Sequence, residues 1–592
     1  MKSWIFTRWR MAPARLVMAP LVALSGALLA QDAASPRLVL PEGLDPALAA
    51  NISAQVQLPR QQPCDAPLTR LRSLLPQTRV QLDQALQALG YYKARHDVQV
   101  NATPDGACWQ LVLGLDPGPQ VRLNQVNIQI LGTANTQTLF APDLASANLQ
   151  RGQTLHQGRY EDLKSALSGR AADQGYFDAR FDRSEIALDL VDNSADINLI
   201  FNPGAQYRFG PITLRGQEPL RVDLVRNMLA VREGDPYTSD RLADLRARLD
   251  ASQFFSEIRA VPNLGQSVEQ RIPVDVDLQL RPRHAWTGGI GFSTDIGPQA
   301  RLSYQNRYVN SRGHTFNADS SISAVRSQIN GSYNIPLSGD TARKLVLSSG
   351  YTVEDANTYT SKRLLSAVTV TDQTASGLRR SAFLELQRDA YEVGAEQQTS
   401  VLLMPGASLS KSMADDPINP RQGWKLFASL RGASDTLLSD ATLVQLYGAA
   451  KYIHSLGDLR LLTRLESGST WIDNVEDLPA SLRYFTGGDQ SIRGYGFREL
   501  GPLGADGSTV VGGRNMVVGS LEFDYLVHSN WRVAVFSDAG NAFNNTNDFK
   551  FKRSAGLGVR WLSPVGPIRI DIAHPFDGVD SFRLHITMGP DL

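Results

Sequence analysis

The sequence predicts an α+β region of three small modules in series, followed by an all-β transmembrane barrel of about 16 antiparallel strands. Before residue 283, a pattern of helices and strands recurs at a spacing of roughly eighty residues. Beyond it, helical periodicity disappears, and short stretches of alternating apolar and polar residues run to the end of the chain. The chain also begins like an exported protein, and no later uncharged apolar run approaches the length of a membrane helix.

Residues 1–30 have the order of a secretory signal peptide. Basic residues precede an uncharged apolar run from Leu16 to Ala30, and the first acidic residue is Asp32. A membrane anchor is the alternative, but the run is shorter than the roughly twenty residues that span a bilayer. We therefore expect export and cleavage. In an oxidising compartment, Cys64 and Cys108 are expected to form a disulfide rather than a metal site or a nucleophile.

Three modules are expected at residues 36–118, 119–204 and 205–283. The motif Asp-Pro-Gly-Pro-Gln-Val at 116–121 returns as Asn-Pro-Gly-Ala-Gln-Tyr at 202–207, each time between two apolar strands. Each module also has a helix with apolar residues three, four or seven positions apart, which indicates packing on a sheet. These residues are Leu82, Leu86 and Leu89, then Tyr160, Leu163 and Leu167, then Leu242, Leu245 and Leu249. Three unrelated modules are the alternative, but the shared joint favours a repeat.

The barrel is expected from residue 284 to 592. Its strands alternate, as in the run where Leu521, Phe523 and Tyr525 are separated by Glu522 and Asp524. A soluble sandwich would bury the apolar face, whereas a membrane barrel would turn it toward lipid. Roughly 300 residues without helical periodicity are too many for one sandwich and suit a barrel with long outer loops. Polar side chains such as Glu522 would then face a wet lumen.

A polar, glycine-rich segment at about residues 486–514 separates two predicted strands and contains Arg493, Gly494 and Tyr495. Loops of this length in an ordered domain are usually functional or disordered. The strands that follow carry Glu522 and Asp538. An arginine fork that meets two carboxylates in the lumen would hold the loop inside the barrel.

These residues resemble motifs of a known family. Arg493-Gly494-Tyr495 is similar to the motif in the sixth extracellular loop of the BamA/TamA outer-membrane assembly superfamily, and the modules resemble POTRA domains. Residues 536–540 and 556–571 resemble the barrel-wall motifs of that superfamily. The residues that carry this resemblance are Phe536, Asp538, Gly540, Gly556, Gly558, Arg560 and Trp561. Three modules and the ending at 589–592 are similar to the TamA branch. Family barrels commonly end on an aromatic residue, whereas the last aromatic here is Phe582.

The resemblance implies an outer-membrane protein whose POTRA domains lie in the periplasm, with Arg493 latched to Glu522 and Asp538. It also implies unfolded outer-membrane protein clients, autotransporters among them, the lipid bilayer, and a TamB-like partner anchored in the inner membrane. Clients would bind by strand addition and leave through a weak seam between the first and last barrel strands. The residues expected at the seam are Gly288, Gly289, Gly291, Ile586 and Gly589. Glycines weaken a strand, although relief of barrel curvature is an alternative reason for them.

Two other functions are alternatives to outer-membrane protein assembly. A two-partner secretion pore resembles this chain in the barrel, but such pores carry two POTRA domains and a plug helix, and residues 31–40 are too short and proline-broken for one. Enzymatic activity is not expected, because the sequence has no Gly-x-Ser-x-Gly, His-Glu-x-x-His or P-loop motif. We expect no catalytic residue, cofactor or metal site. Equal numbers of basic and acidic residues, 59 each, give no support for nucleic-acid binding.

Overall fold

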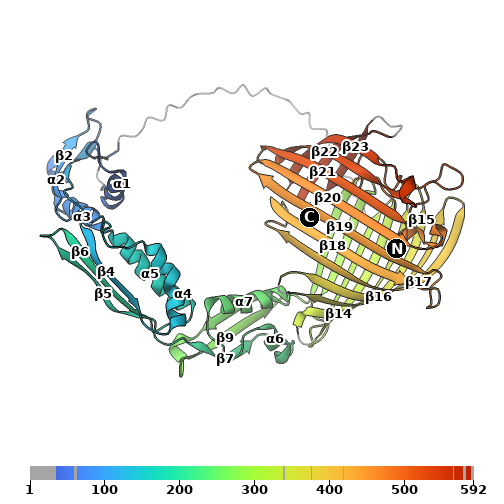
Figure 1. Cartoon of the computed structure of the whole chain (residues 1–592), viewed down its shortest axis with the longest axis horizontal. Coiled ribbons are helices and arrows are strands. Elements are labelled where there is room, and N and C mark those ends of the chain that lie inside the picture. Colours follow the sequence, from blue (N-terminus) through green and yellow to red (C-terminus); the bar gives the residue numbers. More distant parts are fainter. Residues whose placement is uncertain are drawn as a thin grey trace, which may run out of the picture. The chain divides into compact units, whose positions relative to one another are not determined.

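The computed structural model describes residues 35–58, 63–337, 340–374, 376–417, 419–563, 566–577 and 582–588. The expected signal peptide and Gly589 lie outside these residues. The chain divides into two compact units, one of Met1–Ala172 with Tyr176–Ala205 and one of Asp173–Gly175 with Gln206–Leu592. Figure 1 shows helix-and-strand modules along the chain and a barrel of long, inclined strands.

The first unit contains two modules. The first module consists of β1 (Arg37–Val39), α1 (Pro46–Gln55), α2 (Leu68–Arg72), α3 (Leu75–Ala88), β2 (Arg95–Ala102) and β3 (Trp109–Asp116). Its sheet has the order β1-β3-β2, with β1 parallel to β3. Leu82 and Leu86 of α3 are buried against Leu111 and Leu113 of β3. A disulfide joins Cys64 to Cys108.

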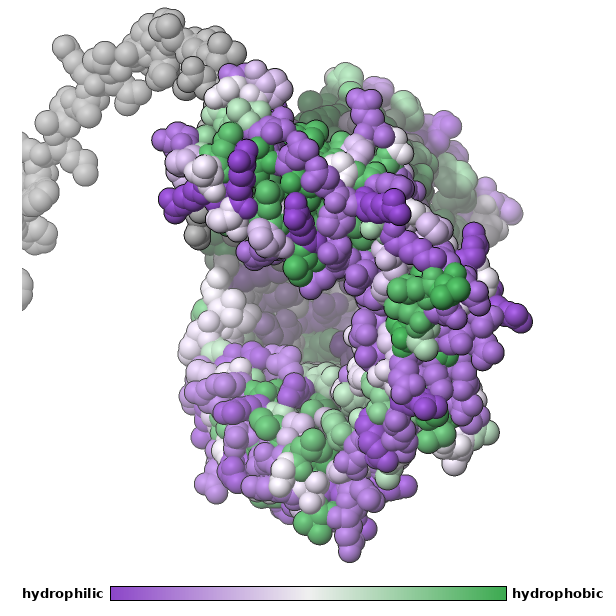
Figure 2. All heavy atoms as spheres, turned by 90° about the vertical axis from the view of Figure 1, so that its left-hand side faces the viewer, coloured by the Kyte–Doolittle hydropathy of each residue, from purple (hydrophilic) through white to green (hydrophobic). Residues whose placement is uncertain are grey.

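The second module repeats this order. It consists of β4 (Arg122–Ile130), α4 (Ala134–Ala147), α5 (Gln157–Asp173), β5 (Arg180–Asp189) and β6 (Ser194–Asn202), with the sheet order β4-β6-β5. Leu163 and Leu167 of α5 are buried against Leu199 and Phe201 of β6. Figure 2, which looks from the left-hand side of Figure 1, shows mostly hydrophilic surface with separate hydrophobic patches. The buried apolar side chains of these two modules form two separate cores.

The third module belongs to the second unit. It consists of β7 (Arg208–Arg215), α6 (Val222–Met228), α7 (Ser239–Ala251), β8 (Phe255–Pro262) and β9 (Arg271–Leu280), with the order β7-β9-β8. At each of the two joints that the sequence repeats, a glycine has a positive φ. Gly118 has φ +63° and Gly204 has φ +75°, conformations that glycine adopts without strain.

The barrel is closed and has sixteen strands, each hydrogen-bonded to its neighbours in chain order. The predicted fold class, including the strand number, is confirmed. Its strands are β10 (His284–Ser293), β11 (Gly297–Asn306), β12 (Thr315–Ser323), β13 (Arg326–Leu337), β14 (Asp340–Asp355), β15 (Thr360–Gln373), β16 (Arg379–Val393), β17 (Glu396–Ala414), β18 (Gln422–Ala433), β19 (Leu443–Leu456), β20 (Leu459–Trp471), β21 (Asn515–His528), β22 (Trp531–Phe543), β23 (Lys552–Ser563), β24 (Gly566–Pro575) and β25 (Arg583–Met588).

The barrel strands turn their apolar side chains outward. Leu521 and Phe523 of β21 are 44% and 39% exposed, whereas Glu522 and Asp524 between them are buried. The same alternation exposes Ile570 and Ile572 of β24 and buries Asp571. An apolar outer band around a polar interior is the arrangement of a membrane barrel. Of the helices that the structure describes, none is long and apolar enough to cross a membrane.

Candidate functional site

Residues 472–514 connect β20 to β21 and form the inner loop. Its short 3-10 helices, η2 (Val475–Asp477) and η3 (Ala480–Leu482), are followed by turns that bring Ile492 and Tyr495 against Met516 and Val518 of β21. All four side chains are buried. The inner loop is thus an ordered part of the barrel interior.

Arg493 is the centre of the polar contacts between the inner loop and the wall. Its backbone N–H and Nε donate to Oδ2 of Asp538 at 3.0 and 2.8 Å, and its Nη2 donates to Oδ1 at 2.9 Å. Nη1 donates to Oε2 of Glu522 at 2.7 Å. The structure therefore brings together the three residues that the sequence analysis grouped, with Arg493 and Glu522 6% and 8% exposed and Asp538 fully buried.

The network around Arg493 is larger than the sequence predicted. Arg493 Nη1 also donates to Asp571 at 3.1 Å. A second cation, Arg560, donates twice to Oε1 of Glu522, at 3.0 and 2.8 Å, and also to Asp571. The Arg493 guanidinium lies 3.4 Å from the centre of the Phe536 ring, a cation–π contact. Two arginines and three carboxylates thus satisfy one another in a buried space, as buried charges require.

The glycines of the wall motifs make room for this network. A Cβ at Gly558 would collide with Asp571 and Arg560, and a Cβ at Gly556 would collide with the Phe536 ring. A Cβ at Gly540 would meet the backbone of Val517 on β21. Trp561 lies on the other face of β23, 39% exposed and stacked on Trp531. The wall motifs therefore have an inner, polar side and an outer, lipid-facing side.

Gly494 and Tyr495 bond the inner loop to β25, to β23 and to a residue just after β24. Gly494 has φ +92°, and its N–H donates to Nε2 of His585 on β25 at 2.8 Å. The Tyr495 hydroxyl donates to the Arg553 carbonyl at 3.2 Å and accepts from the N–H of Asp577 at 3.3 Å. A glycine is required at 494 because of this backbone conformation.

Over the part of the chain that the structure describes, the seam between β10 and β25 has the fewest ladder pairs of any junction in the barrel wall. Among the described residues, the two strands share one ladder pair, Ser293↔Thr587, whereas β24 and β25 share six and β10 and β11 share ten. Hydrogen bonds from Thr294 N–H to the Ile586 carbonyl, 3.1 Å, and from Ile586 N–H to Thr294 Oγ1, 3.2 Å, complete the junction. In this part of the chain, His284–Phe292 of β10 have ladder partners on β11 but none on β25.

The seam glycines lie along this open part of β10. A Cβ at Gly288 or Gly289 would meet nothing within 4 Å, and one at Gly291 would touch only Gln299 at 4.0 Å. Neither steric crowding nor a positive φ requires glycine there. Of the residues expected on the other strand, Ile586 takes part in the junction, but it faces Thr294 and not Gly289. The register of two antiparallel strands could not be read from either strand alone.

A second polar cluster, which the sequence analysis missed, lies at the junction itself. Asp489 of the inner loop, Asp295 after β10 and His585 of β25 bring one ligand-type atom each within 4.8 Å of one another. Burial and the Asp489 carboxylate raise the pKa of Asp295 to about 8. Burial also acts to raise the pKa of Asp489, but hydrogen bonds from His585, Thr294 and Ser293 lower it overall. One proton is therefore retained between the two carboxylates near neutral pH.

The hydrogen bonds of His585 argue against a metal in this cluster. Its Nε2 accepts from Gly494 N–H, so the proton of the neutral ring lies on Nδ1, which points at Oδ1 of Asp489. A metal-ligating Nδ1 would have to be unprotonated, with the proton on Nε2, where the Gly494 N–H already points. The cluster fits a proton-bearing hydrogen-bond site.

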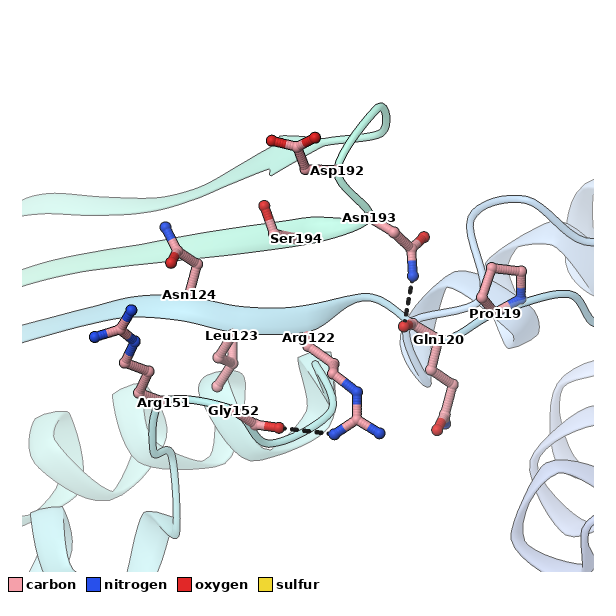
Figure 3. A pocket seen from close by; sticks show the side chains of 10 residues that line it. All are labelled: Pro119, Gln120, Arg122, Leu123, Asn124, Arg151, Gly152, Asp192, Asn193 and Ser194. Carbon is pink, nitrogen blue, oxygen red and sulfur yellow. Dashed lines mark hydrogen bonds between the residues drawn. The ribbon is translucent and has the colours of Figure 1, made fainter.

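Away from the barrel, a recess of about 580 Å³ lies beside the edge strand β4. Figure 3 shows Arg122, Asn124 and Arg151 along it, with Arg122 bonded to the Gly152 carbonyl and Asn193 bonded to the Gln120 carbonyl. Strand β4 pairs only with β6 among the named strands. This edge is therefore open to a further strand along most of its length.

Comparison with known proteins identifies the family of this chain. The Omp85 superfamily domain matches residues 287–590, the first POTRA domain of TamA matches 42–117, and a second POTRA description, the surface antigen variable number repeat, matches 207–282. The chain belongs to the Omp85 superfamily. Like other Omp85 proteins with this architecture, it is an outer-membrane barrel whose POTRA domains face the periplasm.

Relatives within the Omp85 superfamily are distant. The outer membrane protein assembly factor BamA of Nitratidesulfovibrio vulgaris is 22% identical over 454 residues, which cover 72% of this chain and 56% of that protein. BamA of Neisseria meningitidis is 22% identical over 578 residues, 82% of this chain and 68% of that one. The crystal structure of Haemophilus ducreyi BamA lacking POTRA domains 1–3 has a TM-score of 0.66 at 17% identity, covering 79% of this chain and 99% of that one. This structural likeness shows the shared fold.

Proposed function

We propose that this Omp85 protein inserts other β-barrel proteins into the outer membrane, by pairing their strands with the open edge of β10. The proposal rests on the strand pairing at the seam. Among the described residues, β10 and β25 share one ladder pair, and nine residues of β10, His284–Phe292, are left without a β25 partner. Unpaired backbone groups are costly in hydrocarbon, so an incoming strand that satisfies them gains free energy without nucleotide or metal.

The position of the open edge supports delivery from the periplasm. Strand β10 begins at His284, four residues after β9 of the third POTRA domain ends at Leu280, and its paired end is Ser293, at the opposite end of the strand. The unpaired stretch is thus the part nearest the periplasmic domains. The free edge of β4 beside the recess in Figure 3 offers an earlier binding place, where the backbone of a client can add to the sheet.

The finer assignment is to the TamA branch, with autotransporters among the clients and a TamB-like protein as the inner-membrane partner. It is supported by the match of residues 42–117 to the first POTRA domain of TamA. Three consecutive three-stranded sheets before the barrel agree with it. Co-purification of the full chain with an inner-membrane protein of the TamB type is the direct test, and loss of capture when residues 36–118 are removed would assign the contact to the first domain.

The insertion mechanism is tested by locking the seam. Phe292 and Met588 flank the Ser293↔Thr587 pair, and both side chains are exposed on the outer face. With Phe292→Cys and Met588→Cys, a short bis-maleimide should join the strands, while the native disulfide has no free thiol to react. We expect the locked protein to lose client insertion, and each single-cysteine variant treated with the same reagent to keep it. Full activity of the locked protein would refute lateral insertion. Client protein in the medium instead of the membrane would indicate a secretion pore.

A further inference from the structure

In the described residues the two seam strands share one ladder pair, and a side chain of the inner loop is hydrogen-bonded to both of them. Asp489 accepts from Ser293 Oγ at 2.8 Å and from Thr294 Oγ1 at 2.7 Å, both at the end of β10. It also accepts from the Asp295 N–H at 3.2 Å. On the other side, its Oδ1 is bonded to Nδ1 of His585 on β25. One buried carboxylate thus touches both strands that must separate if the barrel is to open.

His585 fastens β25 to the inner loop at two points. Its Nδ1–H donates to Asp489, and its Nε2 accepts from Gly494 N–H at 2.8 Å. These two loop positions flank Arg493, which is anchored to Asp538 on β22 and to Glu522 on β21. The imidazole, whose side chain is 2% exposed, is therefore bonded to the same loop segment that Arg493 fixes to β21 and β22.

The backbone of the loop is shaped to deliver Asp489 to this place. Gly487 and Gly488 have φ +98° and +105°, and a Cβ at Gly488 would lie 2.5 Å from an Asp295 carboxylate oxygen. Asp489 N–H donates to that carboxylate at 2.7 Å. A tight turn built from two glycines thus sets the carboxylate between β10 and β25.

We propose that Asp489 and His585 are positioning residues that clasp the seam shut, so that release of the inner loop and opening of the seam are one event. The consequence for client insertion rests on the proposed function, whereas the clasp itself is a property of the isolated barrel. When the inner loop moves, Ser293, Thr294 and His585 lose their shared acceptor, and the strands are held by the one ladder pair and the two hydrogen bonds between Thr294 and Ile586. The free edge of β10 then also includes Ser293, the residue that is paired in the closed seam.

The clasp is tested on the purified full chain without any client. Phe292→Cys and Met588→Cys report seam closure through the rate of bis-maleimide cross-linking, and Leu302→Cys with Ser320→Cys, a directly paired position of β11 and β12, reports the integrity of the wall. We expect Asp489→Ala to lower the equilibrium constant for seam closure about tenfold, the effect of losing one charge-assisted hydrogen bond, with the β11–β12 rate unchanged.

Four further variants make the test specific. Asp506→Asn removes another inner-loop carboxylate, one whose hydrogen bonds go to Ser508 and Thr509 of its own turn, and should leave the seam rate as in the wild type. His585→Asn keeps a donor near Asp489 but loses the acceptor for the Gly494 N–H. His585→Gln keeps the acceptor for Gly494 but loses the donor to Asp489. Each should therefore loosen the seam less than His585→Ala, which loses both. Unchanged cross-linking in Asp489→Ala, or an equal effect of Asp506→Asn, would overturn the clasp. A loosened seam with unaltered client insertion would support the clasp and count against the proposed function.

Discussion

Arg493 is joined to Asp538 by three hydrogen bonds, two from its guanidinium and one from its backbone N–H. The aspartate therefore holds the side chain and the main chain of the inner loop at once. A lysine in place of the arginine would keep a charge but lose the fork, and could not reach Asp538 and Glu522 together.

We accordingly expect Arg493→Lys and Arg493→Ala both to release the inner loop, with Arg493→Ala the more severe. Removal of one partner from a buried ion pair costs about 3–5 kcal/mol. The measurement is protease cleavage within residues 472–514 in detergent-solubilised protein. Arg312→Lys, at an exposed position, is the matched control and should cleave as slowly as the wild type. An equally protected loop in Arg493→Ala would show that the contacts do not hold it.

The open space beside Gly288 and Gly289 predicts that alanine at these positions stabilises the barrel but slows client insertion. The Cβ of an alanine would fit at both sites without a contact within 4 Å. Because alanine lowers the conformational entropy of the unfolded chain, such a substitution stabilises the folded protein by about 0.4–1 kcal/mol. The double variant Gly288→Ala/Gly289→Ala should raise the thermal unfolding temperature of the barrel and slow client insertion. Gly519→Ala in β21, where a Cβ also has room, should stabilise without slowing insertion. Faster insertion by the double variant would contradict the role given to the flexible edge.

The disulfide between Cys64 and Cys108 should stabilise the first unit alone. These cysteines are 44 residues apart, and closing a loop of that size contributes about 4 kcal/mol in the chain-entropy description. In Cys64→Ala/Cys108→Ala, limited proteolysis should cut residues 35–172 much faster while the barrel remains intact. Equal destabilisation of the barrel would show that the two units unfold together.

Asp295 predicts a pH dependence of the seam. Its pKa is raised to about 8 in the folded protein, against an ordinary value of about 3.9, so the folded state binds more protons between these values. Stability from this group is therefore present at low pH and is lost as pH rises toward 8. The ionisable groups that face it are Asp489, His585 and Arg583. Seam cross-linking should decline as pH is raised through this range, and Asp295→Asn should abolish the decline. A seam that tightens with rising pH would exclude the shared proton.

The tautomer of His585 predicts indifference to divalent metals. Because Nε2 accepts a hydrogen bond from Gly494 N–H, we expect EDTA or added Ca²⁺ or Zn²⁺ to leave the seam cross-linking rate of the purified barrel unchanged. Asp489→Ala provides the reference for a loosened seam. A seam that loosens in EDTA and recovers with metal would assign the cluster to a cation after all.

Much of this molecule follows from local pattern. The alternation of Leu521, Glu522 and Phe523 determines which side chains meet lipid and which meet the lumen, because successive residues of a strand point to opposite faces. The joints at Gly118 and Gly204 mark where one module passes into the next, since a positive φ favours glycine. From such signals the fold class was predictable, as was the grouping of Arg493 with Glu522 and Asp538.

The remaining contacts of the inner loop and the seam depend on the closed barrel. The contact of Asp571 with Arg493 depends on how far the inner loop reaches into the barrel. Asp489 meets Thr294, 195 residues away, and His585, 96 residues away. The pairing of Ser293 with Thr587 likewise depends on how fifteen preceding strand pairs add up around the wall. Contacts of this kind arise from ring closure, which no stretch of sequence contains by itself.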